Sequence, residues 1–167
     1  MRKSVQFTLA ASMLCMASAA SAAGKISIVD YCDPNDPAWG PTGGCLLKEG
    51  DVTFAEFSAL LHSVLSYAVV GHPGWRFQPS FTELRPDESL RVTNDGGRTH
   101  TFTEVANFGG GKVPPLNEGL TPAPECAGST DIPAGGRLEL RGLGSGDHLF
   151  QCCIHPWMRA LVKVEDD

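Results

Sequence analysis

Near the end of the sequence, a thiol, an imidazole and a thioether follow one another at three-residue spacing, from Cys152, His155 and Met158. A second imidazole comes from His100, which follows a run of turn residues. Thiolate and thioether are soft ligands and imidazole is borderline, so the set suits copper better than calcium or magnesium. We therefore predict one metal site made of His100, Cys152, His155 and Met158.

Two other interpretations fit part of this pattern. Taken alone, Cys-x-x-His-Pro-x-Met is compatible with a strand end that carries a buried methionine. Zinc also takes Cys and His, although it rarely uses Met. The upstream His100 argues against the first interpretation, because both segments then fall at the ends of expected strands. The thioether of Met158 favours copper over zinc.

The two segments resemble those of the cupredoxins, the small blue-copper proteins. The resemblance rests on Thr93-Asn94 and His100-Thr101 upstream and on the Cys-x-x-His-x-x-Met loop, which is most similar to the short ligand loop of amicyanin. It covers roughly residues 68–164. It implies one type 1 copper ion, with His100, Cys152 and His155 as equatorial ligands and Met158 as the axial ligand. Asn94 would brace the site by hydrogen bonding.

Two features depart from the family pattern. A long insert separates the two ligand segments, and residues 107–128 within it are rich in Gly and Pro and lack apolar periodicity. That composition predicts a long loop, which is commonly functional or tied down. A second cysteine, Cys153, directly follows the ligand cysteine. In an extended strand Cys152 and Cys153 point to opposite faces, so both cannot face the metal.

Short runs of alternating apolar residues between turn signals predict an all-β fold, a Greek-key sandwich or barrel. The resemblance makes it cupredoxin-like. The predicted strands are 75–79, 81–84, 89–93, 99–105, 137–141, 148–152 and 159–164. One helix is expected within 51–70, where apolar residues recur at helical spacing and Thr53 with Glu56 fits a capping box. Its apolar stripe would cover one face or end of the barrel.

The first residues predict export. Arg2 and Lys3 precede an apolar run, and Ala20-Ser21-Ala22 fits a signal-peptidase site. Polar residues interrupt the run too often for a membrane span. We expect a signal peptide over 1–23, an N-terminal extension with the helix over 24–70 and the copper-binding domain over 71–167. The location would be the periplasm, or the exterior of a cell that lacks one.

The cysteine count fits this picture. Six cysteines are present, and Cys15 would leave with the signal peptide. The odd number that remains fits one metal thiolate plus two disulfides, although a free thiol would also produce it. Four remaining cysteines can pair in three ways. Cys32 with Cys45 is the most local pairing, and it would leave Cys126 to tie the insert to Cys153.

The sequence offers no catalytic constellation: no Ser/His/Asp set, no plausible carboxylate pair and no phosphate loop. We therefore expect no enzyme. The resemblance to the blue-copper proteins implies a soluble single-electron carrier with a transient redox partner protein, and we expect a monomer. The formal net charge of −6 argues against nucleic acid. The alternatives are an exported protein for copper storage, delivery or homeostasis and a detached accessory domain of a copper oxidase or reductase. Pro156 and Trp157 beside His155 would form an apolar rim for electron exchange. His62, His72 and His148 are not expected to be ligands.

Overall fold

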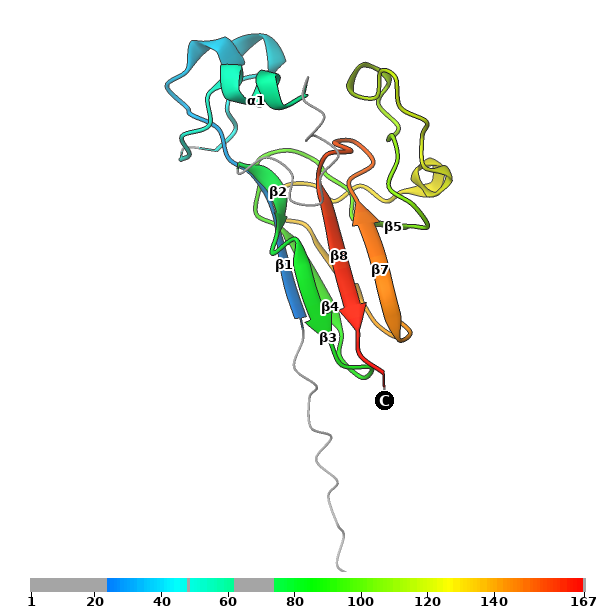
Figure 1. The fold of residues 1–167 in the computed structure, drawn as a ribbon. Coiled ribbons are helices and arrows are strands. Elements are labelled where there is room, and N and C mark those ends of the chain that lie inside the picture. Colours follow the sequence, from blue (N-terminus) through cyan, green and yellow to red (C-terminus); the bar gives the residue numbers. More distant parts are fainter. Residues whose placement is uncertain (1–23, 48, 62–73, 167) are drawn as a thin grey trace, which may run out of the picture.

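The protein is a sandwich of two four-stranded sheets (Figure 1). The structure is a computed structural model, and it describes residues 24–47, 49–61 and 74–166. The first sheet has the order β2-β1-β4-β6, with bounds Trp75–Gln78, Gly24–Asp30, Leu90–Asn94 and Arg137–Leu140. The second has the order β3-β8-β7-β5, with bounds Phe81–Leu84, Arg159–Val164, Gly146–Gln151 and Thr103–Val105. The expected all-β class is confirmed.

Strand β1 was not among the strands predicted from the sequence. It pairs in parallel with β4, from Gly24 opposite Leu90 to Ile28 opposite Asn94, and antiparallel with β2 on its other side. The stretch that we expected as an extension therefore supplies an interior strand of the first sheet. The other predicted strands are present within a residue or two, except that β5 begins only at Thr103.

The core lies between the sheets. Alternate residues of β1 and β4, such as Ile26 and Val92, are fully buried and belong to one apolar cluster that also includes Phe150 and Val162 from the second sheet. Burying each such side chain contributes about 1.5 to 3 kcal/mol. Phe102 stacks on Phe150 with ring centroids 4.3 Å apart, so the segment that follows His100 is anchored in this core.

Helix α1 (Phe54–Leu61) lies at one end of the sandwich, opposite the end where the chain finishes (Figure 1). The expected capping box is confirmed, because the Thr53 backbone N–H donates to Glu56 and the Glu56 N–H donates to Thr53 Oγ1. Phe57 packs on Trp75 and Trp157, with ring centroids 4.8 and 5.6 Å apart. The helix thus covers an end of the sandwich as expected. Residues 62–70 of the predicted helix, with His62 and His72, lie outside the described residues.

The expected insert is an irregular segment containing two short 3-10 helices, η3 (Pro114–Leu116) and η4 (Pro124–Gly128). It is tied to the end of β7 by a disulfide between Cys126 and Cys153. The Lys112 N–H also donates to the Cys153 carbonyl at 2.6 Å, and the Gly109 N–H donates to the Gln151 side chain at 2.9 Å. The loop is therefore fixed against the strand that carries Cys152.

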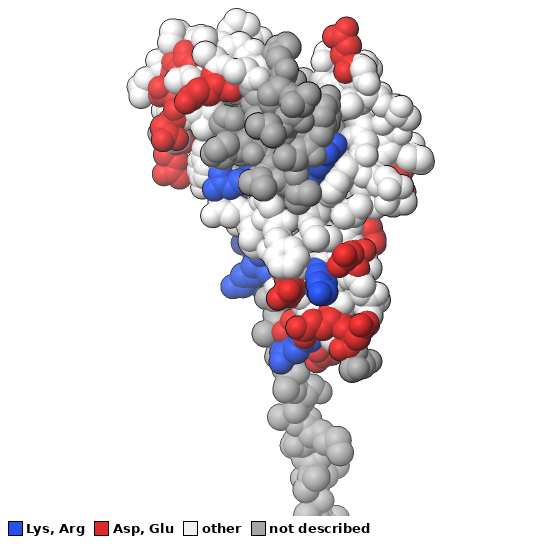
Figure 2. All heavy atoms as spheres, viewed as in Figure 1, with Lys and Arg blue, Asp and Glu red and all other residues white. Residues whose placement is uncertain are grey.

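The surface is mixed in charge. On the face in Figure 2, acidic side chains gather over the part of the chain that includes α1 and around the end of the sandwich where the chain finishes, with fewer basic side chains between them. Within residues 24–47, 49–61 and 74–166, no helix is long and apolar enough to cross a bilayer.

The approach of the insert to β7 can be tested at Gly111. A Cβ at this position would overlap the carbonyl oxygen of Cys153, whereas a Cβ at Gly128 would meet no atom within 4 Å. We expect Gly111→Ala to lower the free energy of unfolding by about 1 to 3 kcal/mol, as overpacking does. Gly128→Ala should change it by less than about 0.5 kcal/mol. Urea unfolding with intact disulfides measures both, and equal stabilities would contradict the close approach.

Candidate metal centre

Three buried side chains converge at the helix-covered end of the sandwich. Nδ1 of His100 and Nδ1 of His155 are 3.1 Å apart, and they lie 3.8 and 3.6 Å from Sγ of Cys152. Cys152 is fully buried and directly follows β7, while His100 lies between β4 and β5 and pairs with Ile132 through an isolated bridge. Residues that are far apart in the sequence thus present one thiol and two imidazoles to one point.

The Cys-x-x-His-x-x-Met segment forms a compact turn between β7 and β8. The Cys152 N–H donates to the Met158 carbonyl at 3.0 Å, and the Met158 N–H donates to the His155 carbonyl at 2.9 Å. These two bonds fix the three-residue spacing as a loop in which all three side chains are buried. Met158 is fully buried in the same apolar cluster as Cys152. The metal ligation predicted for these residues stays a prediction.

The loop that carries His100 is braced by Asn94 at the end of β4. Its side-chain amide donates to the carbonyls of Arg98 and Ile132 at 2.7 and 2.8 Å, and its oxygen accepts from the Gly96 N–H at 3.0 Å. The bracing expected of Asn94 is therefore observed. Asn94 is fully buried, so these bonds are shielded from water.

The cysteine sulfur accepts hydrogen bonds from two backbone N–H groups. The Thr101 N–H lies 3.3 Å and the His155 N–H 3.4 Å from Sγ of Cys152. Thr101 also accepts a bond from the Cys153 N–H at 2.7 Å, which couples the two ligand segments. Such donors stabilise negative charge on sulfur and tune a metal bound there. Pro156 has no N–H to add.

Asp30 is a part of this centre that sequence reasoning missed. Its Oδ2 lies 3.0 Å from Nε2 of His100, and its carboxylate accepts from the N–H groups of Gly97 and Arg98 at 2.7 and 2.8 Å. The side chain is 2% exposed. Asp30 ends β1, and no spacing in the sequence links it to His100; the missing signal was the parallel pairing of β1 with β4.

The three charges in this cage support one another. Burial alone would lower the pKa of His100, but its hydrogen bonds to Asp30 and Cys152 and their charges raise it to about 9. Burial opposes ionisation of Cys152, yet hydrogen bonds with His100 and His155 and their charges hold the pKa of the thiol well below its usual range. Burial also disfavours the Asp30 carboxylate, but hydrogen bonds from His100, Gly97 and Arg98 lower its pKa.

The triangle of donors is close to the size that one metal ion requires, with the sulfur–nitrogen edges matching better than the nitrogen–nitrogen edge. A metal at its centre, about 2.0 Å from each nitrogen and about 2.3 Å from the sulfur, would separate sulfur from nitrogen by about 3.7 Å and the nitrogens by about 3.5 Å. The sulfur–nitrogen distances here are 3.8 and 3.6 Å, and the nitrogen–nitrogen distance is 3.1 Å. One soft sulfur and two imidazoles also fit the chemistry of copper. The residues present therefore fit the predicted group.

Aromatic rings enclose the triangle. Trp75 and Trp157 lie against the His155 ring with centroids 5.3 Å away, and Trp39 from η1 (Pro37–Thr42) stacks on Trp75 at 6.0 Å. The expected apolar rim is wrong as a surface feature, since Pro156 is buried and Trp157 is 3% exposed. Trp157 is buried because Phe57 of α1 packs on it and Trp39 of η1 packs on Phe57.

The disulfides follow the pairing suggested by the sequence. Cys32 bonds to Cys45 and Cys126 to Cys153, which leaves Cys152 as the free cysteine of the described chain. Cys153 belongs to a separate small cluster with Val105 and Cys126, so the two adjacent cysteines face opposite sides as predicted. His148 bonds to Glu104 and the Gly144 carbonyl, each at 2.7 Å, and is not part of the triangle.

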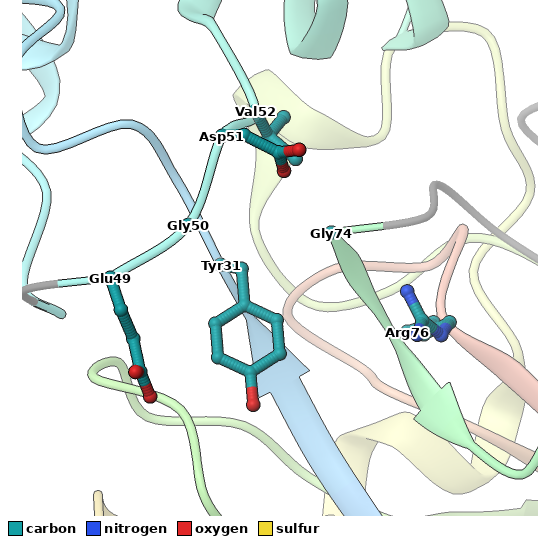
Figure 3. A pocket seen from close by; sticks show the side chains of 7 residues that line it. All are labelled: Tyr31, Glu49, Gly50, Asp51, Val52, Gly74 and Arg76. Carbon is teal, nitrogen blue, oxygen red and sulfur yellow. The ribbon is translucent and has the colours of Figure 1, made fainter.

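A second polar site lies beside the first sheet. A pocket of about 510 Å³ is bordered by Tyr31, Glu49, Asp51 and Arg76, with Gly50, Val52 and Gly74 between them (Figure 3). None of the described residues that line it is a His, Cys or Met. The wall of this pocket is connected through Val52 to the aromatic cover of the triangle, formed by Trp39, Trp75 and Trp157. The Val52 carbonyl accepts from the indole N–H of Trp39 at 3.1 Å.

Comparison with known proteins gives distant structural likenesses. No protein-family model matches the sequence, and no curated protein matches it. Among solved structures, a purple cupredoxin from Nitrosopumilus maritimus is 21% identical, over 85% of this chain and 99% of that one, with a TM-score of 0.43. A methionine-to-alanine mutant of amicyanin in the Cu(I) state is 18% identical, over 54% of this chain and 73% of that one, with a TM-score of 0.38.

The two adjacent cysteines provide the first test of the centre. We expect Cys152→Ser to abolish the thiolate-to-copper colour of the loaded protein. Cys153→Ser should keep the colour and lower the free energy of unfolding by about 3.5 kcal/mol, the chain-entropy value for a loop of this length. Visible spectra and denaturant unfolding measure the two effects. If the colour depends on Cys153 instead, the ligand assignment is displaced by one residue.

Proton competition provides the second test. With its pKa raised to about 9, His100 carries a proton at neutral pH that the metal must displace. The apparent Cu(I) affinity should therefore rise about tenfold per pH unit and level off above about 9. Competition with a chromophoric chelator measures it.

His148 supplies the control for this experiment, since its pKa is also raised but it lies outside the triangle. His148→Gln should leave the pH profile unchanged. An affinity in the parent protein that does not vary with pH from neutral to about 9 would contradict His100 as a protonated ligand.

Proposed function

We propose that this protein is a type 1 copper protein that carries single electrons outside the cytoplasm. His100, Cys152 and His155 would hold the ion closely, and Met158 would be the weak axial ligand. The buried triangle of two Nδ1 atoms and one Sγ, with edges that fit one ion, is the observation that supports the proposal most directly. Copper, when bound, supplies a one-electron couple between Cu(I) and Cu(II).

The chain's own contribution is to keep the donors fixed. Cys152 is held by the β7 register and the backbone bond to Met158, and His100 is held by Asp30 on one side and Ile132 on the other. A cage that is braced in this way resists rearrangement when the charge of the bound ion changes. Little rearrangement means a low barrier to electron transfer.

Burial of the donors favours a carrier over an enzyme. His100 and Cys152 are fully buried and His155 is 8% exposed. Rings of Trp75 and Trp157 lie beside His155 and help to bury it. An enzyme would need a path for substrate to the ion, whereas an electron carrier needs only close approach of a partner.

The location follows from cysteine chemistry and the predicted signal peptide. Two disulfides, Cys32–Cys45 and Cys126–Cys153, suit an oxidising compartment. Together with the export signal expected over 1–23, they support a periplasmic or secreted protein. A transient redox partner would reach the centre across the aromatic cover, since the His155 ring contacts Trp75 and that ring stacks on Trp39.

The axial position distinguishes an electron carrier from a protein that only binds metal. Met158→Gln replaces a soft sulfur by a harder amide oxygen, which favours Cu(II). The variant should still bind copper, stay coloured and have a lower reduction potential. Met158→Leu is the matched variant of similar volume; it offers no donor and should raise the potential. Redox titration with copper analysis measures both.

Removal of an equatorial ligand should have a different effect. His100→Ala opens the triangle, so we expect weaker Cu(II) binding and loss of the parent spectrum. The proposal fails if the parent protein does not cycle reversibly between Cu(I) and Cu(II), or if neither substitution of Met158 moves the potential. Colourless protein that binds Cu(I) alone would instead favour storage or delivery.

A further inference from the structure

Asp30 brings a negative charge to the back of the His100 ring. We propose that Asp30 is a positioning residue of this centre: it accepts the Nε2–H of His100, leaves Nδ1 to face Cys152, and stabilises Cu(II) relative to Cu(I). The inference rests on the proposed copper function. It assigns a task to a residue that lies on β1, outside both ligand segments.

Both carboxylate oxygens of Asp30 have hydrogen-bond partners. Oδ2 contacts both Nε2 of His100 and the Arg98 N–H, and Oδ1 accepts from the Gly97 N–H. Gly96 lies against the same carboxylate, where a Cβ would be 2.6 Å from Oδ1. Three consecutive residues of the loop are thus shaped around one side chain. The Asp30 carboxylate therefore contacts both the His100 ring and the backbone of the loop that precedes it.

This contact determines which nitrogen of His100 is available. A neutral imidazole has one N–H and one lone pair, and the hydrogen bond made by one nitrogen fixes the role of the other. A carboxylate beside Nε2 retains the proton there, so Nδ1 presents its lone pair. Nδ1 is the atom that lies 3.1 Å from His155 Nδ1 and 3.8 Å from Cys152 Sγ. Carboxylates behind metal-bound histidines commonly orient the ring and increase its basicity in this way.

Burial makes the charge of Asp30 effective. Asp30 is the only carboxylate among the buried residues of the described chain. Charges interact more strongly in the interior than at the surface, because the effective dielectric constant is lower. The guanidinium of Arg98 forms no ion pair with Asp30 among the described residues; it donates to the carbonyls of Thr42 and Gly44 and lies over the Trp75 ring. The carboxylate therefore favours the more positive oxidation state of a bound ion.

The test is Asp30→Asn in the full chain, loaded with copper. Asparagine keeps the size and one acceptor but removes the charge. We expect Cu(II) affinity to fall about 10- to 100-fold, as for other residues that support a metal ligand. Cu(I) affinity should fall less, so the reduction potential should rise. Competition assays measure the affinity for each ion, and a redox titration checks them, because the ratio of the two affinities must account for the shift in potential.

Glu104→Gln is the matched control. Glu104 is also a carboxylate hydrogen bonded to a histidine, His148, but this pair lies on the outer part of the second sheet and not in the triangle. Like Asp30→Asn, the Glu104→Gln substitution removes one negative charge from the protein. Both copper affinities and the potential should stay at the parent values. If they shift as much as in Asp30→Asn, net charge rather than position is responsible and the inference fails.

A measurement on the parent protein covers the case in which Asp30→Asn does not fold. In the Cu(I) form, proton NMR should show a His100 Nε2–H that is shifted downfield and protected from exchange. Its absence would overturn the inference, as would an Asp30→Asn variant that loses stability but keeps the parent ratio of Cu(II) to Cu(I) affinity. If the parent binds no copper or does not cycle, the proposed function itself fails, and this inference with it.

Discussion

The structure depends on burying an ionisable thiol and an imidazole side by side in the interior. His100 and Cys152 are both fully buried, and a buried charge is costly unless it is paired and hydrogen bonded. Each of these groups stabilises the charged form of its neighbour. Asp30 and Cys152 together raise the pKa of His100 to about 9, and the two histidines lower the pKa of the thiol. Two backbone N–H groups complete the bonds to the sulfur. These contacts hold the predicted donors close to one another.

The N-terminal half of the chain completes a site to which it contributes no predicted ligand. Strand β1 carries Asp30 to the back of His100, and the same strand is held between β2 and β4 in the first sheet. The segment after it, closed by the Cys32–Cys45 disulfide, brings Trp39 onto Trp75. The insert fixes the other side of β7 through Cys126–Cys153. Each of these two parts of the chain thus contains a disulfide-bonded cysteine and contacts a segment that carries predicted ligands.

Local features of the centre could be predicted from the sequence, and non-local ones could not. The spacing of Cys152, His155 and Met158 describes one turn, and the opposite facing of Cys152 and Cys153 follows from strand geometry; the fold bears out that facing. Asp30 was missed because its role requires a parallel pairing between β1 and β4, which no local pattern encodes. The burial of Trp157 was missed for a similar reason, since Phe57 and Trp75 approach it from distant segments. The residues next to Trp157 in the sequence do not show whether its ring is exposed or covered.

The depth of the donors bears on whether the protein would pass on electrons or metal. Delivery of an ion requires a partner's ligand to reach it and replace the chain's own donors one by one. Here the sulfur is fully buried, His155 is 8% exposed, and aromatic rings lie against that histidine. Exchange would therefore require the cover of Trp75 and Trp157 to separate from a core to which Phe57 also belongs. An electron needs no such opening, because it can cross closely packed rings without displacing an atom. The same packing that hinders metal transfer is compatible with electron transfer, and this asymmetry favours the carrier.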